Sequence, residues 1–192
     1  PDEIPVILDA KSGDIGNTQR LYGQAAFEAF GVDALTVSPY VGDDAVLPLL
    51  EAYPGRGLFV LARTSNPAAG RFQDHPGRAP RLYEQVVDAG REWQVASPAS
   101  TLGLVVGATY PAEIEALRRR APELPFLVPG VGAQGGALDA AVASGPTVDG
   151  LGPVISASRG VLYASGGPDF ANAARQAALE WRAAISNLRA PE

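Results

Sequence analysis

The feature that most constrains the fold is a series of six short apolar runs, separated by stretches with helical spacing or by turn residues. Apolar residues follow one another in these runs without regular polar alternation, which indicates parallel strands covered on both faces. Parallel strands need crossover connections, and these are normally right-handed and helical. The sequence therefore predicts an α/β protein with parallel strands at residues 4–11, 34–38, 58–62, 102–107, 126–128 and 154–156.

The segments between these runs predict helices. Residues 19–30 place apolar side chains at helical spacing, and Gly31 is expected to end that helix. Asp43 and Asp44 are expected to cap the next helix. Residues 118–120 are three arginines, predicted to form a solvated helix end that complements the helix dipole. The remaining predictions are helices at 46–50, 81–95, 111–120, 137–144 and 168–188, and a functional lid or binding loop at 68–80.

Composition narrows the classes of function. The formal net charge of -6 gives no electrostatic reason to expect nucleic acid or an anionic membrane as a partner. The absence of cysteine excludes disulfides and zinc–cysteine sites, and the single histidine, His75, excludes a multi-histidine metal centre. His75 lies among turn residues and is expected to be solvated. With 192 residues, no membrane-spanning apolar run and no signal-peptide pattern, the chain is expected to be a single cytoplasmic domain.

Two architectures are compatible with six βα units. A doubly wound open sheet needs about five or six strands, whereas a (β/α)₈ barrel needs eight. Both bind ligands at the carboxyl ends of their strands, but a site assembled from many separate strands is typical of a barrel. Polar clusters follow the ends of the predicted strands at Asp9-x-Lys11, Ser65-Asn66, residues 130–136 and Ser158-Arg159-Gly160. This distribution favours the barrel.

The first of these clusters contains the only lysine of the chain, Lys11, between Asp9 and Asp14. All other basic residues of the chain, apart from His75, are arginines. A lysine at this position therefore suggests a task for a side chain that can lose and regain a proton, which a guanidinium cannot do. On a regular strand Asp9 and Lys11 would project to the same side. We therefore predict a carboxylate–ammonium–carboxylate cluster, the alternative being an ordinary surface salt bridge.

A glycine-rich segment at residues 129–136 predicts a phosphate site. Glycines allow backbone N–H groups to approach an anion closely, and the helix predicted after them adds a favourable dipole. Arg159, after the last predicted strand, could bind the same phosphate through two hydrogen bonds, although a surface salt bridge is an alternative. The spacing Gly130-x-Gly132-x-x-Gly135 also matches a dinucleotide fingerprint, but it follows the fifth strand and lacks the expected acidic residue after the next strand.

Together these motifs resemble the orotidine 5'-monophosphate decarboxylases, in their longer bacterial subgroup. The stretch Asp9-x-Lys11-x-x-Asp14, with Thr18 beyond, is similar to the family's Asp-x-Lys-x-x-Asp signature. The segments 64–67, 129–136 and 158–160 resemble its later motifs in the same order. The resemblance implies a TIM barrel in which the six strands are strands three to eight. It also implies a homodimer with shared active sites and no cofactor or metal.

The resemblance further implies a role for each candidate residue in converting orotidine 5'-monophosphate to uridine 5'-monophosphate. Lys11 would donate a proton to the C6 carbanion, Asp9 would orient the ammonium, and Asp14 would complete the cluster from the neighbouring subunit. The substrate-binding residues implied are Ile15 and Thr18 across the dimer, Ser65 and more weakly Asn66 at the pyrimidine, and Gln134, Gly135, Arg159 and Gly160 at the 5'-phosphate.

The sequence departs from the family at one point. The family has a further lysine on the strand before Asp9-x-Lys11 and an aspartate on the strand before that one, and neither is found here. We therefore expect two N-terminal βα units of a single barrel domain to be missing from residues 1–192. Three alternatives remain: a sugar-phosphate decarboxylase or aldolase of the same barrel type using magnesium, a nicotinamide-dependent oxidoreductase, and a uridylate-binding relative without activity.

Overall fold

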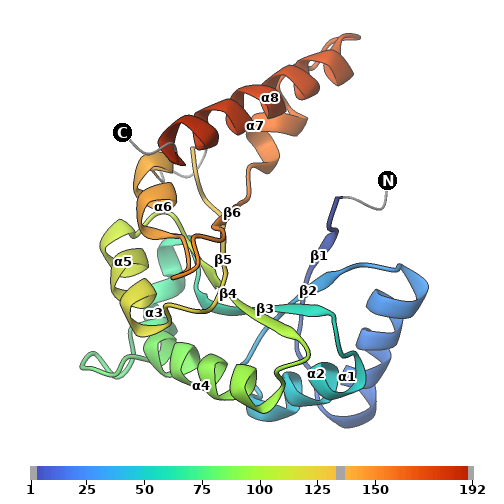
Figure 1. Cartoon of the computed structure of the whole chain (residues 1–192), viewed down its shortest axis with the longest axis vertical. Coiled ribbons are helices and arrows are strands. Elements are labelled where there is room, and N and C mark those ends of the chain that lie inside the picture. The colour runs from blue at the N-terminus through green and yellow to red at the C-terminus, as the bar shows by residue number, and fades with distance from the viewer. Residues whose placement is uncertain (1–3, 133–136, 190–192) are drawn as a thin grey trace. The chain divides into compact units, whose positions relative to one another are not determined.

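A computed structural model describes residues 4–132 and 137–189 (Figure 1). The chain divides into two compact units, residues 1–105 and 106–192. The described residues contain six strands, one for each apolar run, and the predicted strand positions are therefore confirmed. In the described part of the chain, no helix has the length and apolar character needed to cross a membrane.

The first unit is built on four neighbouring strands in the order of the sequence. They are β1 (Ile7–Ser12), β2 (Ala34–Val37), β3 (Gly57–Arg63) and β4 (Thr101–Val106). The pairs β1–β2 and β2–β3 are parallel, with Leu35 opposite both Leu8 and Leu58. Parallel strands joined by helices are the arrangement that the apolar runs predict.

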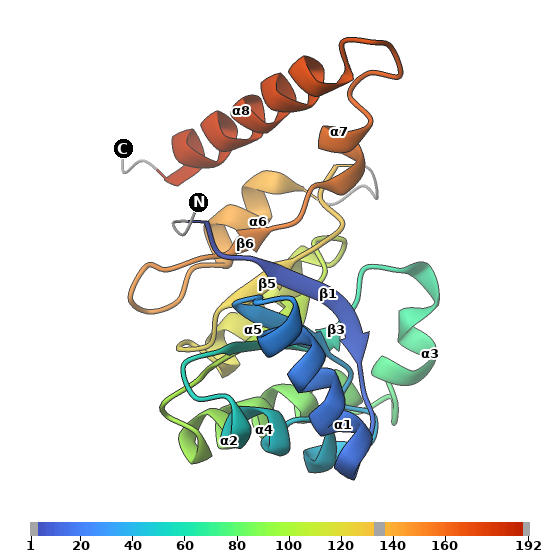
Figure 2. The same cartoon turned by 90° about the vertical axis from the view of Figure 1, so that its right-hand side faces the viewer.

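Helices connect these strands (Figure 2). They are α1 (Gly16–Gly23), a π-helix (Gln24–Ala29), a 3₁₀-helix (Gly42–Ala45), α2 (Leu47–Ala52), a 3₁₀-helix (Pro67–Ala69), α3 (Gly70–Gln73) and α4 (Leu82–Ala96). The helix predicted at 19–30 starts at Gly16 and changes to π-helix in its second half. Asp43 and Asp44 lie inside a 3₁₀-helix instead of capping α2, so that prediction was wrong. The predicted lid segment contains α3, and His75 after it is exposed as expected.

The core of this unit lies around the central strands. All four residues of β2 are buried, and Val37 and Val60 are completely inaccessible to solvent. Burying such side chains contributes about 1.5–3 kcal/mol each. The first strand differs, because all six residues of β1 are exposed or half-buried. Within residues 1–192, β1, the strand that carries Asp9 and Lys11, is therefore not covered on both faces as β2 is.

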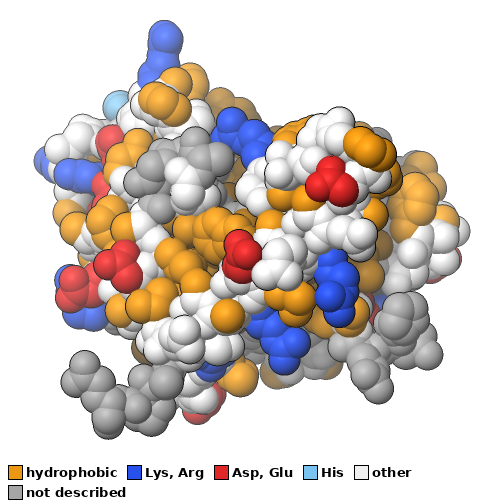
Figure 3. Space-filling model, turned by 90° about the horizontal axis from the view of Figure 1, so that it is seen from above, with side chains coloured by type: hydrophobic (Ala, Val, Ile, Leu, Met, Phe, Trp, Pro, Cys, Tyr) orange, Lys and Arg blue, Asp and Glu red, His pale blue; other side chains and the backbone are white. Residues whose placement is uncertain are grey.

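The second unit contains the parallel pair β5 (Phe126–Val128) and β6 (Val154–Ile155). Its helices are α5 (Pro111–Arg120), α6 (Leu138–Ser144), α7 (Ser158–Leu162) and α8 (Phe170–Arg189). Three of them match predicted helices, whereas α7 was not predicted. The residues of α8 are exposed or half-buried, and the space-filling view shows hydrophobic side chains open at the surface among scattered acidic and basic ones (Figure 3).

The predicted arginine-rich helix end is only partly solvated. Arg119 is exposed and pairs with Glu115, as expected for the end of α5. Arg118 instead lies half-buried with its guanidinium 3.7 Å from the centre of the Phe126 ring. It donates hydrogen bonds to the carbonyl oxygens of Ala121, Pro122, Leu124 and Gly145. The prediction of a solvated end was therefore wrong for Arg118, which joins the end of α5 to the loops beside it.

Candidate active site

The end of β1 is not a regular strand. From Leu8 to Ser12 the strand advances four residues while its partner β2 advances two, from Leu35 to Val37. Lys11 lies inside this bulge, and its backbone φ of 51° is in the left-handed region that non-glycine residues rarely occupy. Bulges change the direction in which side chains leave a strand. The bulge therefore decides where the side chains of Asp9 and Lys11 point.

The bulge brings the two charged groups together. The Lys11 ammonium nitrogen, Nζ, lies 2.6 Å from each carboxylate oxygen of Asp9. Their contact confirms the predicted pairing, although it arises from the bulge and not from regular strand alternation. The Lys11 side chain is 49% exposed and that of Asp9 61% exposed. An ion pair this exposed contributes at most about 1 kcal/mol to stability.

Thr36 on β2 completes this arrangement and was missed from the sequence. Its hydroxyl accepts the backbone N–H of Lys11 at 2.8 Å and donates to Oδ1 of Asp9 at 2.9 Å. The available signal was weak: Thr36 is the one polar residue of β2, in a strand that is otherwise apolar and buried.

Asp14 does not join the Asp9–Lys11 pair within the described chain. Its carboxylate accepts the backbone N–H of Ile15, and its own N–H donates to the side-chain oxygen of Gln19. Gln19 is fully buried and its amide nitrogen also donates to the carbonyl of Ala45. This buried glutamine, also missed from the sequence, fixes the turn before α1. Thr18 and Ile15 are exposed there.

The residues after β3 form a second polar group in the first unit. The Thr64 hydroxyl donates to the side-chain oxygen of Asn66, while Ser65 is half-buried. Gln73 of α3 accepts the backbone N–H of Thr64 and donates to its hydroxyl. The segment that the sequence predicts as a lid is therefore attached to the strand end that carries Ser65 and Asn66.

Arg63, at the end of the same strand, is buried to 2% exposure and was not predicted as a site residue. Its guanidinium lies 3.4 Å from Asp74 and 5.2 Å from the centre of the Tyr83 ring. These contacts connect β3 to the segment after α3 and to α4. Arg63 therefore serves to hold the strand end in place.

The second unit carries the glycine-rich segment and Arg159. Gly130 and Gly132 have φ values of 93° and 72°, a backbone conformation that favours glycine. Gln134 and Gly135 lie outside the described residues. Arg159 and Gly160 are in the first turn of α7, and both are exposed. Their position after β6 was predicted, but their helical conformation was not.

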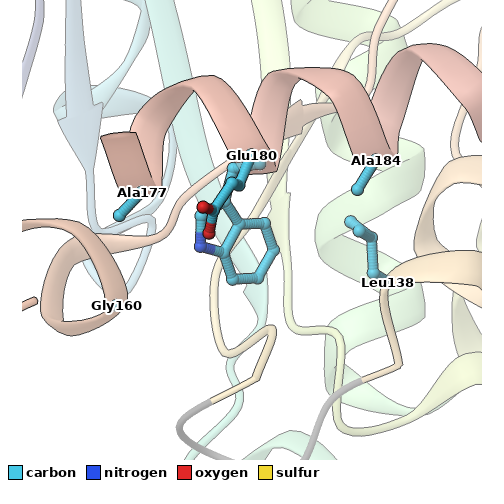
Figure 4. Close-up of a pocket in the computed structure, with 6 residues that line it drawn as sticks. Leu138, Gly160, Ala177, Glu180 and Ala184 are labelled. Atoms are coloured by element: carbon cyan, nitrogen blue, oxygen red, sulfur yellow. The ribbon is translucent and has the colours of Figure 1, made fainter. Parts of the chain in front are cut away.

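Trp181 of α8 lies against both parts of the predicted phosphate site. A Cβ atom placed on Gly132 would lie 3.5 Å from the Trp181 ring, and one placed on Gly160 would lie 3.4 Å from its ring nitrogen. A cavity of about 310 Å³ adjoins this tryptophan. Leu138 and Ala184 both line it, and their side chains point toward one another (Figure 4).

Titration and metal binding add little to this picture of the site. Burial lowers the pKa of Arg118 to about 10, and burial together with Glu28 raises the pKa of Tyr53, but both residues lie outside the predicted site. Among the described residues there is no group of three or more His, Cys, Asp or Glu side chains that could hold a metal ion.

Comparison with known proteins identifies the family. The model of the orotidine 5'-phosphate decarboxylase / HUMPS family matches residues 2–177. The orotidine 5'-phosphate decarboxylase of Cupriavidus necator is 50% identical over 187 residues, covering 97% of this chain and 67% of that protein. The corresponding protein of Azoarcus sp. is 50% identical, covering 97% of this chain and 68% of its own length.

Solved structures agree with this result. The structure of Leishmania donovani OMP decarboxylase matches with a TM-score of 0.82 and 38% identity, covering 98% of this chain and 70% of that chain. Leishmania donovani UMP synthase matches with the same TM-score and 41% identity, covering 96% of this chain and 40% of the other. With the βα order described above, this similarity shows an α/β fold of the TIM-barrel type. The chain belongs to the orotidine 5'-phosphate decarboxylase / HUMPS family.

Proposed function

We propose that this chain is a carboxy-lyase that converts orotidine 5'-monophosphate to uridine 5'-monophosphate in pyrimidine biosynthesis, with Lys11 as the proton donor. The family membership and the decarboxylase name of the relatives support the reaction. One observation carries the assignment of the donor. The only lysine of residues 1–192 is held 2.6 Å from both oxygens of Asp9, so its ammonium has a fixed direction.

The chemistry follows from the charges of this pair. Cleavage of the bond between C6 and the carboxylate releases carbon dioxide and leaves the electron pair on C6. The Lys11 ammonium gives its proton to C6 and becomes a neutral amine, which regains a proton from solvent. Asp9 keeps its charge throughout and holds the ammonium in one direction, so the donor loses little freedom when the transition state forms.

The other predicted residues would bind the rest of the substrate. Ser65 would hydrogen-bond the pyrimidine, with Asn66 as a weaker candidate. The proposed phosphate ligands are Gln134, Gly135, Arg159 and Gly160. Binding energy gained at a phosphate distant from the reacting carbon can be used to raise the rate of the chemical step. Replacing Arg159 by Ala should therefore weaken uridylate binding, and unchanged binding would argue against this assignment.

We also propose a homodimer whose active sites are shared. Asp14, Ile15 and Thr18 would then contact the substrate of the neighbouring subunit. The exposure of Ile15 and Thr18 supports this arrangement, as does an Asp14 carboxylate whose hydrogen-bond donor within the described part of its own chain is the backbone N–H of Ile15. Mixing inactive Lys11→Ala and Asp14→Asn proteins should restore part of the activity if sites are shared, and no recovery would contradict sharing.

The extent of the barrel is a further part of the proposal. We infer that the six strands are strands three to eight of an eight-stranded barrel and that residues 1–192 belong to a single barrel domain. The chain covers 67% of the length of the Cupriavidus necator relative, so about a third of that relative has no counterpart in residues 1–192. An experimental structure in which β1 occupied another barrel position would contradict this numbering.

The test of the function is decarboxylation of orotidine 5'-monophosphate, followed by loss of ultraviolet absorbance without added metal. Lys11→Arg is the sharpest variant, because it keeps the positive charge but cannot supply the proton. We expect activity in the unchanged protein and none in Lys11→Arg or Lys11→Ala. Arg119→Ala, an exposed cation outside the proposed site, is the matched control and should keep full activity.

Other outcomes separate the alternatives. Turnover in Lys11→Arg would exclude Lys11 as the donor. No turnover in the unchanged protein, with uridylate binding retained, would indicate a decarboxylase without its first two units or a degenerate relative that only binds. Loss of both would refute the assignment of the ligand. Turnover of a sugar phosphate that requires magnesium would indicate the related decarboxylase or aldolase.

A further inference from the structure

The hydroxyl of Thr36 closes a ring of hydrogen bonds around Lys11. The backbone N–H of Lys11 donates to the Thr36 oxygen at 2.8 Å, and the Thr36 hydroxyl donates to Oδ1 of Asp9 at 2.9 Å. Oδ1 of Asp9 in turn accepts the Lys11 ammonium at 2.6 Å. The backbone and the side chain of one lysine are thus both connected to the same carboxylate through a single hydroxyl.

The direction of the hydrogen bonds in this ring is set by chemistry. A hydroxyl has one proton to donate, and two acceptors lie near Thr36: Oδ1 of Asp9 at 2.9 Å and the carbonyl of Leu8 at 3.5 Å. The carboxylate is nearer and charged, so it takes the proton. A backbone N–H can only donate, which leaves the hydroxyl oxygen as its acceptor.

The bulge explains why a hydroxyl is needed beside the backbone of Lys11. The left-handed backbone at Lys11 interrupts the pairing of β1 with β2 between Leu8 and Ser12. Thr36 lies on β2 between the two register positions and gives the displaced N–H of Lys11 a partner. Its side chain is only 1% exposed, so it is positioned to act on Lys11 and Asp9 and not on a bound substrate.

We propose that Thr36 is a positioning residue, which holds the bulged backbone of Lys11 and the carboxylate of Asp9 in the arrangement that aims the ammonium. The structural part of this proposal stands on the hydrogen bonds alone. Its consequence for the rate rests on the proposed function. The two parts are therefore tested separately, with the variant Thr36→Val, which removes the hydroxyl, and Thr36→Ser, which restores it.

The structural test uses the fact that Lys11 is the only lysine. In a chain of residues 1–192, labelling with ¹⁵N-lysine gives a single backbone amide signal, and its hydrogen exchange reports on the bond to Thr36. We expect exchange of this amide to become about tenfold faster in Thr36→Val, the factor that corresponds to one lost hydrogen bond, and to recover in Thr36→Ser. Equal exchange rates in folded Thr36→Val and unchanged protein would overturn the proposal, whether or not the protein is active.

The kinetic test compares kcat with KM. Loss of a hydrogen bond to a charged group should lower kcat of Thr36→Val about ten- to a hundredfold, while KM and uridylate binding change little because Thr36 is buried. Thr36→Ser should recover most of the rate. An unchanged kcat together with accelerated amide exchange would show that Thr36 holds the backbone but does not influence the reaction, which overturns the catalytic part.

A matched control separates this effect from a general loss of stability. Thr147 is also buried, and its hydroxyl accepts the backbone N–H of Leu151 at 3.0 Å in the second unit. Thr147→Val should lower the melting temperature but leave kcat and the Lys11 amide unchanged. If Thr147→Val lowered kcat as much as Thr36→Val, the rate loss would reflect stability alone and the proposal would fail. An inactive unchanged protein would refute the proposed function only.

Discussion

Arg118 should contribute far more to stability than its neighbours in the arginine run of α5. The perturbation is Arg118→Ala, compared with Arg119→Ala one residue later in the same helix. Arg118 donates to four carbonyl oxygens and lies over the Phe126 ring, whereas Arg119 is exposed and pairs with Glu115 one helical turn away. The two variants remove the same side chain from very different surroundings.

The expected magnitude follows from these contacts. Three of the hydrogen bonds of Arg118 are short, at 2.8 Å to Ala121, 2.8 Å to Leu124 and 2.7 Å to Gly145. Leaving a buried carbonyl without its donor costs about 1 kcal/mol or more, and loss of the ring contact about another 0.5–1 kcal/mol. We therefore expect Arg118→Ala to lower the free energy of unfolding by about 3–4 kcal/mol, against less than about 0.5 kcal/mol for Arg119→Ala.

Urea unfolding at neutral pH, followed by circular dichroism, measures both values. Burial lowers the pKa of Arg118 to about 10, which leaves the guanidinium charged under these conditions. Arg118→Lys should recover only part of the loss, because an ammonium cannot reach carbonyls in the fork geometry of a guanidinium. If Arg118→Ala were as stable as Arg119→Ala, water would be binding the four carbonyl oxygens in place of the guanidinium. The expected cost of leaving these carbonyls without a donor would then be wrong.

Two further predictions concern Trp181 and Tyr53. Trp181→Leu should weaken binding of uridylate more than binding of uridine in calorimetric titrations, because the ring lies against Gly132 and Gly160 of the proposed phosphate site; equal losses for both ligands would contradict this. Burial and the hydrogen bond to Glu28 raise the pKa of Tyr53 above its usual value of 10.0. The stabilisation by the Tyr53 hydroxyl should therefore be complete below pH 10.0 and should decline as the pH rises through the pKa of the folded state. The stability difference between the unchanged protein and Tyr53→Phe, from urea unfolding, should therefore shrink in strong alkali, and a constant difference would oppose this assignment.

The strands could be predicted because their signal is local. A buried parallel strand must be apolar along its whole length, and β2, β3 and β4 satisfy this rule with few exceptions. Most helices were likewise predictable from their spacing. The short helix α7 was not, since Ser158-Arg159-Gly160 contains no apolar periodicity and a glycine that is unfavourable within a helix.

Long-range partners explain the errors at charged residues. Nothing within the arginine run distinguishes Arg118 from Arg119, because the carbonyl of Gly145 and the Phe126 ring come from other segments. The same holds for Gln19, whose burial depends on Ala45. A side chain that can be solvated is predicted to be solvated unless its partners are known.

The geometry of Lys11 shows both the success and the limit of sequence reasoning. The residue types predicted the contact between Lys11 and Asp9, but the contact arises from a bulge and not from the regular alternation of a strand. A lysine with left-handed backbone costs about 1–2 kcal/mol, so neighbouring groups must offset that strain. The offsetting contacts come from Thr36, which is 25 residues away from Lys11 and 27 from Asp9. A strained backbone that neighbours hold in place is common where a reacting group needs a fixed direction. The strain at Lys11 is therefore an argument for function that only the folded chain provides, and it connects the proposed proton donor to a threonine that cannot itself touch the substrate.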